Sequence, residues 1–199
     1  MQHFSQKYLL PVLILLCCGI TALQADPLVV EELENTYQQG LAYYLGQGNG
    51  KDYLLAASLF KKAAEAHHVE AAFSLGVLFE RGEGVTKNVS EAIKWYEKAA
   101  QEGHAKAQYN LGYLLFEGYG VAQDRVSGIN WLTLAAEQGY AKAQYQLGCA
   151  YLEGKGVSKD PHLAVQWLSK AASQGNSDAA IALNLVQEQE NVVLAEQRS

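Results

Sequence analysis

The chain repeats itself with a period of 36 residues. The run Ala-Gln-Tyr-Asn-Leu-Gly that begins at Ala107 returns as Ala-Gln-Tyr-Gln-Leu-Gly at Ala143, and a looser copy begins at Ala71. Three sets of glycines keep this spacing without drift: Gly40, Gly76, Gly112 and Gly148; Gly46, Gly82, Gly118 and Gly154; and Gly48, Gly84, Gly120 and Gly156. A fixed period of this length is typical of a solenoid, in which each unit packs against its neighbours. A solenoid offers an extended binding surface instead of one buried reaction pocket.

Each unit is expected to form two helices joined by a glycine turn. In the second unit, two apolar stretches at helical spacing, 72–79 and 92–100, lie on either side of Gly82 and Gly84. A glycine where the second helix should end, Gly103, suits a left-handed residue that closes a helix. Candidate caps precede the second helix in every unit: Asp52, Asn88 or Ser90, Asp124 and Asp160.

The first glycine set lies inside a predicted helix, where glycine costs roughly 1 kcal/mol relative to alanine. Four such costs in register require a steric reason, and we expect close crossing of the two helices of each unit. Alanine pairs in the second helices suit the same short distance: Ala63 and Ala64, Ala99 and Ala100, Ala135 and Ala136, and Ala171 and Ala172. Trp95, Trp131 and Trp167 are expected to fill the space between units.

The full pattern is Ala-x-x-x-Leu-Gly-x-x-aromatic-x-x-Gly-x-Gly-Val, followed by Ala-x-x-Trp-aromatic/Leu-x-x-Ala-Ala-x-x-Gly. It resembles the Sel1-like repeat, a relative of the tetratricopeptide repeat, over about residues 35–186. The resemblance implies an all-α fold: a right-handed α-solenoid of four helix-turn-helix Sel1-like repeats plus a C-terminal capping helix. Sel1-like proteins are adaptors in many pathways, so the resemblance implies protein binding without naming a partner.

The ends of the chain depart from the repeat pattern. In the first unit Leu59 replaces the tryptophan and His67 the helix-ending glycine, and after the fourth unit Asn184 replaces glycine. Atypical terminal units are expected, because they cap the stack. The boundaries predicted from the sequence are a signal peptide at 1–25, a solenoid at 26–190 with repeats at 35–70, 71–106, 107–142 and 143–178 and a cap at 179–190, and a frayed tail at 191–199.

The front of the chain has the three parts of a secretory signal peptide. A short basic start with Lys7 precedes an apolar run at 8–22, and the small residue Ala25 follows. The run contains Pro11 and is short of the ~20 residues that a membrane span needs. The sequence therefore predicts a periplasmic or secreted protein of bacterial type, without stable membrane insertion after signal removal.

Two alternatives to signal removal stay open. One is retention of the apolar run as an anchor. The other is lipid attachment at Cys17 or Cys18, although Leu16 is a poor residue to precede a lipidated cysteine.

Composition argues against several function classes. The net charge is −6, and loss of a signal that carries Lys7 makes the chain more acidic, so neither nucleic acid nor an anionic membrane is an expected partner. No phosphate-binding loop or nucleophile elbow is present. We therefore expect no enzyme activity and no cofactor.

The metal and thiol chemistry of the chain is also limited. His68 and His104 share one repeat position but lack the further ligands that a metal site needs, so no metal is expected. Cys149 is alone beyond residue 25, so no internal disulfide forms there. One Sel1-like branch is reported to bind penicillin-type compounds, but its repeats carry paired cysteines that this chain lacks.

In tetratricopeptide-like solenoids the first helix of each unit lines the concave face. By that resemblance three rows line a groove: Tyr37, Phe73, Tyr109 and Tyr145; Leu41, Val77, Tyr113 and Cys149; and Tyr44, Glu80, Phe116 and Leu152. The predicted partner-binding residues are Tyr44, Tyr109, Tyr113, Phe116 and Tyr145. Charges flank the two ends of this face, Lys106 and Lys142 at one and Glu117 and Glu153 at the other. A structural role stays open for the first row, because its aromatic belongs to the repeat pattern.

The favoured function is an exported adaptor that binds a peptide or protein in this groove. Two alternatives are a cell-wall-directed enzyme or a regulator of one, and a structural part of an envelope assembly. The sequence sets no oligomeric state.

Export leads to the first testable prediction. When the full chain is produced in a bacterial host, N-terminal sequencing of the purified protein should find Asp26 as the first residue, because cleavage follows Ala25. A protein that still begins with Met1 would contradict cleavage, and incorporation of labelled palmitate would favour lipid attachment instead.

Overall fold

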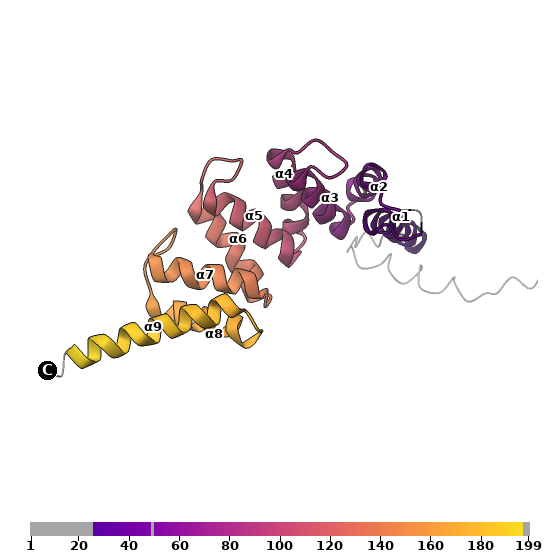
Figure 1. Ribbon diagram of the computed structural model, residues 1–199. Helices are drawn as coiled ribbons and strands as arrows, with labels where there is room; N and C mark the ends of the chain where they lie inside the picture. The colour runs from indigo at the N-terminus through magenta and orange to yellow at the C-terminus, as the bar shows by residue number, and fades with distance from the viewer. Residues whose placement is uncertain (1–25, 49, 197–199) are drawn as a thin grey trace, which may run out of the picture. The chain divides into compact units, whose positions relative to one another are not determined.

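The computed structural model describes residues 26–48 and 50–196, and this part of the chain is helical with no strand (Figure 1). The expected signal peptide and its cleavage site lie outside the described residues, apart from Asp26. Contacts divide the chain into residues 1–32 and 33–199, and the description below concerns the second unit. The helices are α1 (Pro27–Leu45), α2 (Tyr53–Glu65), α3 (Val69–Arg81), α4 (Val89–Gln101), α5 (Ala105–Glu117), α6 (Arg125–Glu137), α7 (Ala141–Glu153), α8 (Pro161–Ser173) and α9 (Ser177–Glu196).

The helices pack in sequence order, as the 36-residue period predicts. Partners within a unit contact one another (α3 with α4, α5 with α6, α7 with α8). The second helix of each unit also contacts the first helix of the next unit (α2 with α3, α4 with α5, α6 with α7, α8 with α9). The fold is therefore an α-solenoid of paired helices, which confirms the fold class predicted from the sequence.

The glycine set inside the first helices marks close helix crossings. A Cβ atom placed on Gly76 would lie 2.7 Å from the ring of Tyr96, and one on Gly148 would lie 2.7 Å from Leu168. Gly40 faces Phe60 in the same way at 2.8 Å. Phe60, Tyr96 and Leu168 share one repeat position and are fully buried, so a buried side chain of each second helix fills the space that glycine leaves on the first helix.

In the third unit the first helix approaches the backbone of its partner helix more closely than in the other units. A Cβ on Gly112 would lie 2.9 Å from the carbonyl oxygen of Gly128, and a Cβ on Gly128 would lie 2.8 Å from the amide nitrogen of Phe116. The other units carry alanine at the position of Gly128: Ala56, Ala92 and Ala164. The second glycine therefore lets α6 approach α5 at its backbone.

The turns join each unit to the unit before it. Gly84 has a φ of 70°, and a Cβ on it would lie only 2.0 Å from the carbonyl oxygen of Tyr53, at the start of α2. Its equivalents face the preceding unit too: a Cβ on Gly120 would lie 2.6 Å from the side chain of Val89, and one on Gly156 would lie 2.9 Å from the Cβ and the carbonyl oxygen of Arg125. The second turn glycine is thus required both for its backbone conformation and for contact between units.

The predicted helix ends are largely confirmed. The side chains of Asp52, Asn88, Asp124 and Asp160 each accept a hydrogen bond from the backbone N–H three residues later. Gly103, Gly139 and Gly175 have positive φ values, as expected of residues that close helices. His67 occupies the same place in the first unit with a φ of 66°, a conformation that costs a non-glycine residue strain.

The last helix differs from the sequence expectation. α9 runs to Glu196, whereas the sequence placed its end near residue 190. No glycine or proline follows Gly175, and leucine, alanine and glutamate favour continuation of a helix.

The close crossing of α5 and α6 leads to the second prediction. Gly112→Val should lower the free energy of unfolding by about 2–3 kcal/mol, because the added side chain overlaps the backbone and side chain of α6. Thermal and urea unfolding would measure the loss. The control is Asn130→Val, which also introduces a valine but at an exposed position of α6, and it should leave stability nearly unchanged. Equal stability of both variants would contradict the packing argument.

Candidate partner-binding face

The aromatic residues of the first predicted row pack against the next unit. Tyr37 stacks on His68 with ring centroids 4.8 Å apart, and Phe73 stacks on His104 at 4.6 Å. Tyr109 contacts Tyr140 at 5.2 Å. His68, His104 and Tyr140 each immediately precede the first helix of a unit. This row therefore joins successive first helices, and its role is structural at least in part.

The two histidines in this row also cap helices, which the sequence reading missed. Nδ1 of His68 accepts the backbone N–H of Ala71 at 3.2 Å, and Nδ1 of His104 accepts that of Ala107 at 3.1 Å. Capping requires an unprotonated Nδ1. Burial lowers the pKa of His104, and nearby Lys106 lowers it further, while Glu70 acts in the opposite direction. The signal for this role was the position of each histidine three residues before an alanine that recurs in the repeat, but histidine is an uncommon cap.

Tyr113 of the second row belongs to a chain of tyrosine rings. It stacks on Tyr109 with ring centroids 6.1 Å apart, and on Tyr119 at 6.3 Å. Tyr119 lies in the turn after α5 and is 60% exposed, so sequence reasoning that followed helical positions passed over it. Burial raises the pKa of the Tyr113 and Tyr109 hydroxyls, so both remain protonated donors at neutral pH. Tyr109, Tyr113, Tyr119 and Tyr140 thus form one continuous aromatic row.

The expectation that Phe116 lies on the binding face is wrong. Its side chain is only 5% exposed and packs in a core cluster with Ile129 and Leu132. The physical reason is Gly128, which allows α6 to approach the backbone of α5 at Phe116. The equivalent Glu80 in the second unit is also committed to structure, because its carboxylate accepts a hydrogen bond from the buried Tyr96 hydroxyl.

Tyr145 lies apart from the other predicted residues. It packs with Cys149 against a small cluster of Leu168, Ala171 and Ala179. A hydrogen bond with Cys149 raises the pKa of the Tyr145 hydroxyl, and burial raises the pKa of the Cys149 thiol. The thiol is therefore kept in its neutral, less reactive form.

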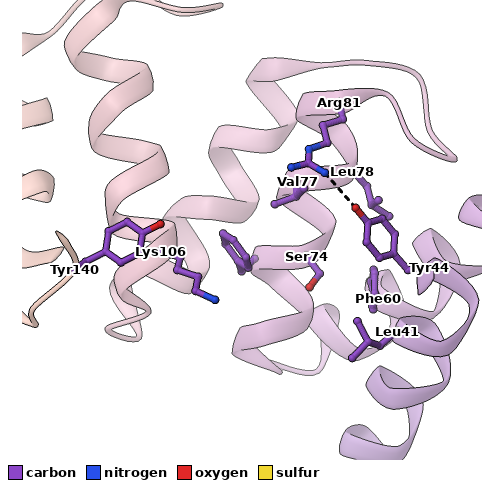
Figure 2. A pocket seen from close by; sticks show the side chains of 10 residues that line it. Leu41, Tyr44, Phe60, Ser74, Val77, Leu78, Arg81, Lys106 and Tyr140 are labelled. Carbon is purple, nitrogen blue, oxygen red and sulfur yellow. Dashed lines mark hydrogen bonds between the residues drawn. The ribbon is translucent and has the colours of Figure 1, made fainter. Parts of the chain in front are cut away.

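The structure contains a cavity that the sequence did not locate (Figure 2). Its volume is about 360 Å³, within the usual range of roughly 300–1,000 Å³ for ligand pockets. Its lining comes from three successive units: Leu41, Tyr44, Phe60, Phe73, Ser74, Val77, Leu78, Arg81, Lys106 and Tyr140. Tyr44 is the predicted site residue that lines it. Tyr140 also contacts Tyr109, so the cavity and the aromatic row are continuous.

Two cationic side chains line this cavity, whose other lining residues are apolar or aromatic apart from Ser74. Arg81 donates a hydrogen bond to the Tyr44 hydroxyl at 3.2 Å, drawn as a dashed line in Figure 2, and lies 4.0 Å from Glu83. Lys106 makes no hydrogen bond or ion pair within the part of the chain that the structure describes. Burial of the Tyr44 ring raises the pKa of its hydroxyl, and Glu83 raises it further, so Tyr44 stays neutral. The arrangement suits an apolar group accompanied by hydrogen-bond acceptors or negative charge.

Within residues 26–48 and 50–196, no three histidine, cysteine, aspartate or glutamate side chains converge on a possible metal position. No helix in this described part is long and apolar enough to cross a membrane.

The Sel1 repeat model matches residues 37–68, 69–104, 105–140 and 141–176, so the chain belongs to the Sel1 repeat family. The last three matches begin at the first residues of α3, α5 and α7, two residues before the unit boundaries chosen from the sequence. Proteins of this family generally mediate protein–protein interactions and are typically non-enzymatic scaffolds. No curated protein sequence matches the chain.

Three solved bacterial structures illustrate the likeness. The chain is 37% identical to c5321, a protective antigen present in uropathogenic Escherichia coli strains displaying an SLR fold, with a TM-score of 0.78 over 82% of this chain and 35% of that one. It is 37% identical to a Sel1 repeat protein from Oxalobacter formigenes, with a TM-score of 0.74 over 79% of this chain and 63% of that one. Helicobacter pylori cysteine rich protein B is 25% identical, with a TM-score of 0.50 over 64% and 96% of the two chains. The chain thus spans about a third of the first of these proteins and under two thirds of the second.

The third prediction follows from the cap at His104. Because the folded-state pKa lies below the ordinary 6.5, the unfolded chain binds more protons in the interval between the two values. The stabilisation is therefore complete above about pH 6.5 and is lost as the pH falls through the folded-state pKa. In His104→Asn the asparagine keeps a capping oxygen but does not titrate. The melting temperature of this variant should therefore fall less between pH 7.5 and pH 5 than that of the native protein.

The control for this measurement is His162→Asn, which changes an exposed histidine on α8. Its melting temperature should fall with pH as that of the native protein does. If His104→Asn shows the same acid loss as the native chain, the cap does not titrate as described.

Proposed function

We propose that this protein is an exported, non-catalytic adaptor that binds a peptide segment of a partner protein on the face formed by its first helices. The observation that carries the proposal is the cavity lined by three successive units, which opens on this face and continues into the tyrosine row. Family membership supports protein binding in general. The proposal adds the location, the peptide form of the ligand and the extracytoplasmic setting.

The lining supports a peptide with a bulky apolar side chain. Leu41, Phe73 and Val77 provide an apolar surface between first helices, and Tyr44 and Tyr140 add rigid rings with polar tips. Burial of one leucine or phenylalanine side chain contributes about 1.5–3 kcal/mol. A cavity of about 360 Å³ has room for such a side chain and adjoining backbone.

The tyrosine row supports contact with a longer stretch of the same peptide. Tyr109, Tyr113 and Tyr119 extend from the cavity wall at Tyr140 to the turn after α5. Stacked rings lose little side-chain entropy on binding, because the free protein already orders them. We propose that the cavity anchors one apolar side chain and that the row accommodates neighbouring residues.

Export rests on the front of the chain. The basic start, apolar run and Ala25 support passage into a periplasmic or extracellular compartment. A single cysteine beyond residue 25 is compatible with an oxidising compartment, because it has no partner for a wrong internal disulfide.

The fourth prediction tests the location of binding. Peptides selected from a random twelve-residue phage-display library against the native protein should bind Val77→Ser about tenfold more weakly, equivalent to about 1.4 kcal/mol. The change removes roughly two buried methyl groups from the ligand contact. Fluorescence anisotropy with synthetic versions of the selected peptides would measure the affinities.

A matched control comes from the repeat. Cys149 occupies the position of Val77 two units later and does not line the cavity, so Cys149→Ser should leave peptide affinity unchanged. Both variants should keep the helical circular-dichroism signal of the native protein. Two results would count against the proposed function: failure to select any peptide, or selected peptides that bind Val77→Ser with the same affinity as the native protein.

A further inference from the structure

We infer that the cavity selects a peptide in which one bulky apolar side chain stands between two acidic side chains. This inference rests on the proposed function and adds the chemical class of the ligand. The inference rests on the sign and the position of the charged side chains that line the cavity. The acidic residues that we propose in the peptide are glutamate and aspartate.

The charge of the cavity is opposite to that of the chain. The sequence has 21 acidic and 15 basic residues, for a net charge of −6. Among the described residues, the charged side chains that line the cavity are Arg81 and Lys106, both cationic. A local reversal of sign beside an apolar surface favours ligands that bring carboxylates with an apolar group, because complementary charge sets specificity and speeds encounter.

The two cations lie toward different ends of the cavity. Arg81 is the last residue of α3 and Lys106 is the second residue of α5. Figure 2 shows Arg81 beside Tyr44 toward one end, and Lys106 and Tyr140 toward the other, with Val77 on the wall. A ligand that fills the apolar part therefore meets a cation on each side.

Both cations keep donors for a ligand. Arg81 uses one N–H on the Tyr44 hydroxyl, its side chain is 59% exposed, and its ion pair with Glu83 is long at 4.0 Å. Lys106 is exposed, and its ammonium group has no hydrogen-bond or ion-pair partner within the described part of the chain. A guanidinium carries five donors and an ammonium three, so each can donate to a carboxylate without breaking the existing contacts. Tyr44 holds the Arg81 guanidinium in place before the ligand arrives.

The ligand pattern follows from extended-chain geometry. In an extended peptide, side chains two residues apart point to the same side. An apolar residue directed into the cavity therefore carries the residues two positions before and after it toward the same face. The expected motif is acidic-x-apolar-x-acidic, with a leucine or phenylalanine at its centre.

The experiment uses the full chain and four fluorescein-labelled nine-residue peptides in a glycine–serine background. Three have a central phenylalanine flanked at plus and minus two by glutamate, glutamine or lysine, and the fourth has a central serine flanked by glutamate. Fluorescence anisotropy should rank the phenylalanine peptides glutamate, then glutamine, then lysine, with at least a tenfold difference between the first and last. The serine-centred peptide should bind at least tenfold more weakly than its phenylalanine counterpart.

Charge reversal supplies the decisive variant and its control. Lys106→Glu should weaken the glutamate-flanked peptide at least fivefold and strengthen the lysine-flanked one. Lys142→Glu makes the same change at the same helix position one unit later, where the lysine is also exposed and does not line the cavity, so it should change neither affinity. Unchanged binding by both variants, or equal changes by both, would overturn the inference.

The outcomes separate this inference from the proposed function. If phenylalanine-centred peptides bind regardless of their flanks, the cavity binds peptides without selecting acidic ones, and the inference alone fails. If the serine-centred peptide binds as well as the phenylalanine one, binding is ionic only and the inference again fails. If none of the peptides binds the native protein, and library selection also returns nothing, the proposed function fails with it.

Discussion

The crossing of two helices at a glycine is the constraint on which the rest of the structure depends. At Gly76 and Gly148 the backbone of a first helix approaches a buried side chain of its partner so closely that a single methyl group would overlap it. Short interhelical distances then require the alanines that line both helices of a pair. Because units this thin bury little surface alone, each depends on its neighbours, and stability is shared along the stack.

A solenoid built in this way separates structural from functional positions. Sets of glycines and alanines occur at fixed places in every unit, and buried leucines recur at 75, 111 and 147, whereas positions 41, 77, 113 and 149 hold Leu, Val, Tyr and Cys. These variable positions lie on the first helices. A cavity formed from several units therefore depends on which variable residues happen to be neighbours. In this chain Val77 lines one cavity with Lys106 and Tyr140 of the next repeat, and that combination defines the site.

Much of the fold could be predicted because its causes are local or periodic. The glycine crossings follow from glycine at one helix position in four units, and Asp52 and Asp160 are caps by residue type and position alone. The histidine caps escaped prediction because histidine rarely fills that role, although each partner amide lies three residues ahead as it does for the aspartate caps. The same positions suggested a comparison with metal ligands and gave no reason to think of capping.

The candidate site was harder to predict because it depends on distances between helices. Phe116 was assigned to the binding face from its helical position, but Gly128 in the facing helix draws it into the core. The sequence contains that glycine, yet its consequence requires knowing which residue it faces. Arg81 was missed because its place in the cavity depends on the Tyr44 hydroxyl, 37 residues away in the chain. Periodicity identifies the face, whereas the pocket on that face depends on cross-unit contacts.

The contact of Gly84 with the backbone of Tyr53 has a consequence for how such chains diverge. At this joint the second unit fits against the first through a glycine and a carbonyl oxygen, neither of which has a side chain that mutation could reshape; at the later joints Gly120 contacts the side chain of Val89, and Gly156 contacts the Cβ and the carbonyl oxygen of Arg125. The pitch between units is therefore set independently of the residues that face a ligand. Substitutions can accumulate on the first helices without changing the spacing of the frame that carries them. A family built on this joint can acquire new ligands by exchanging side chains alone, while the distance from one recognition position to the next stays fixed.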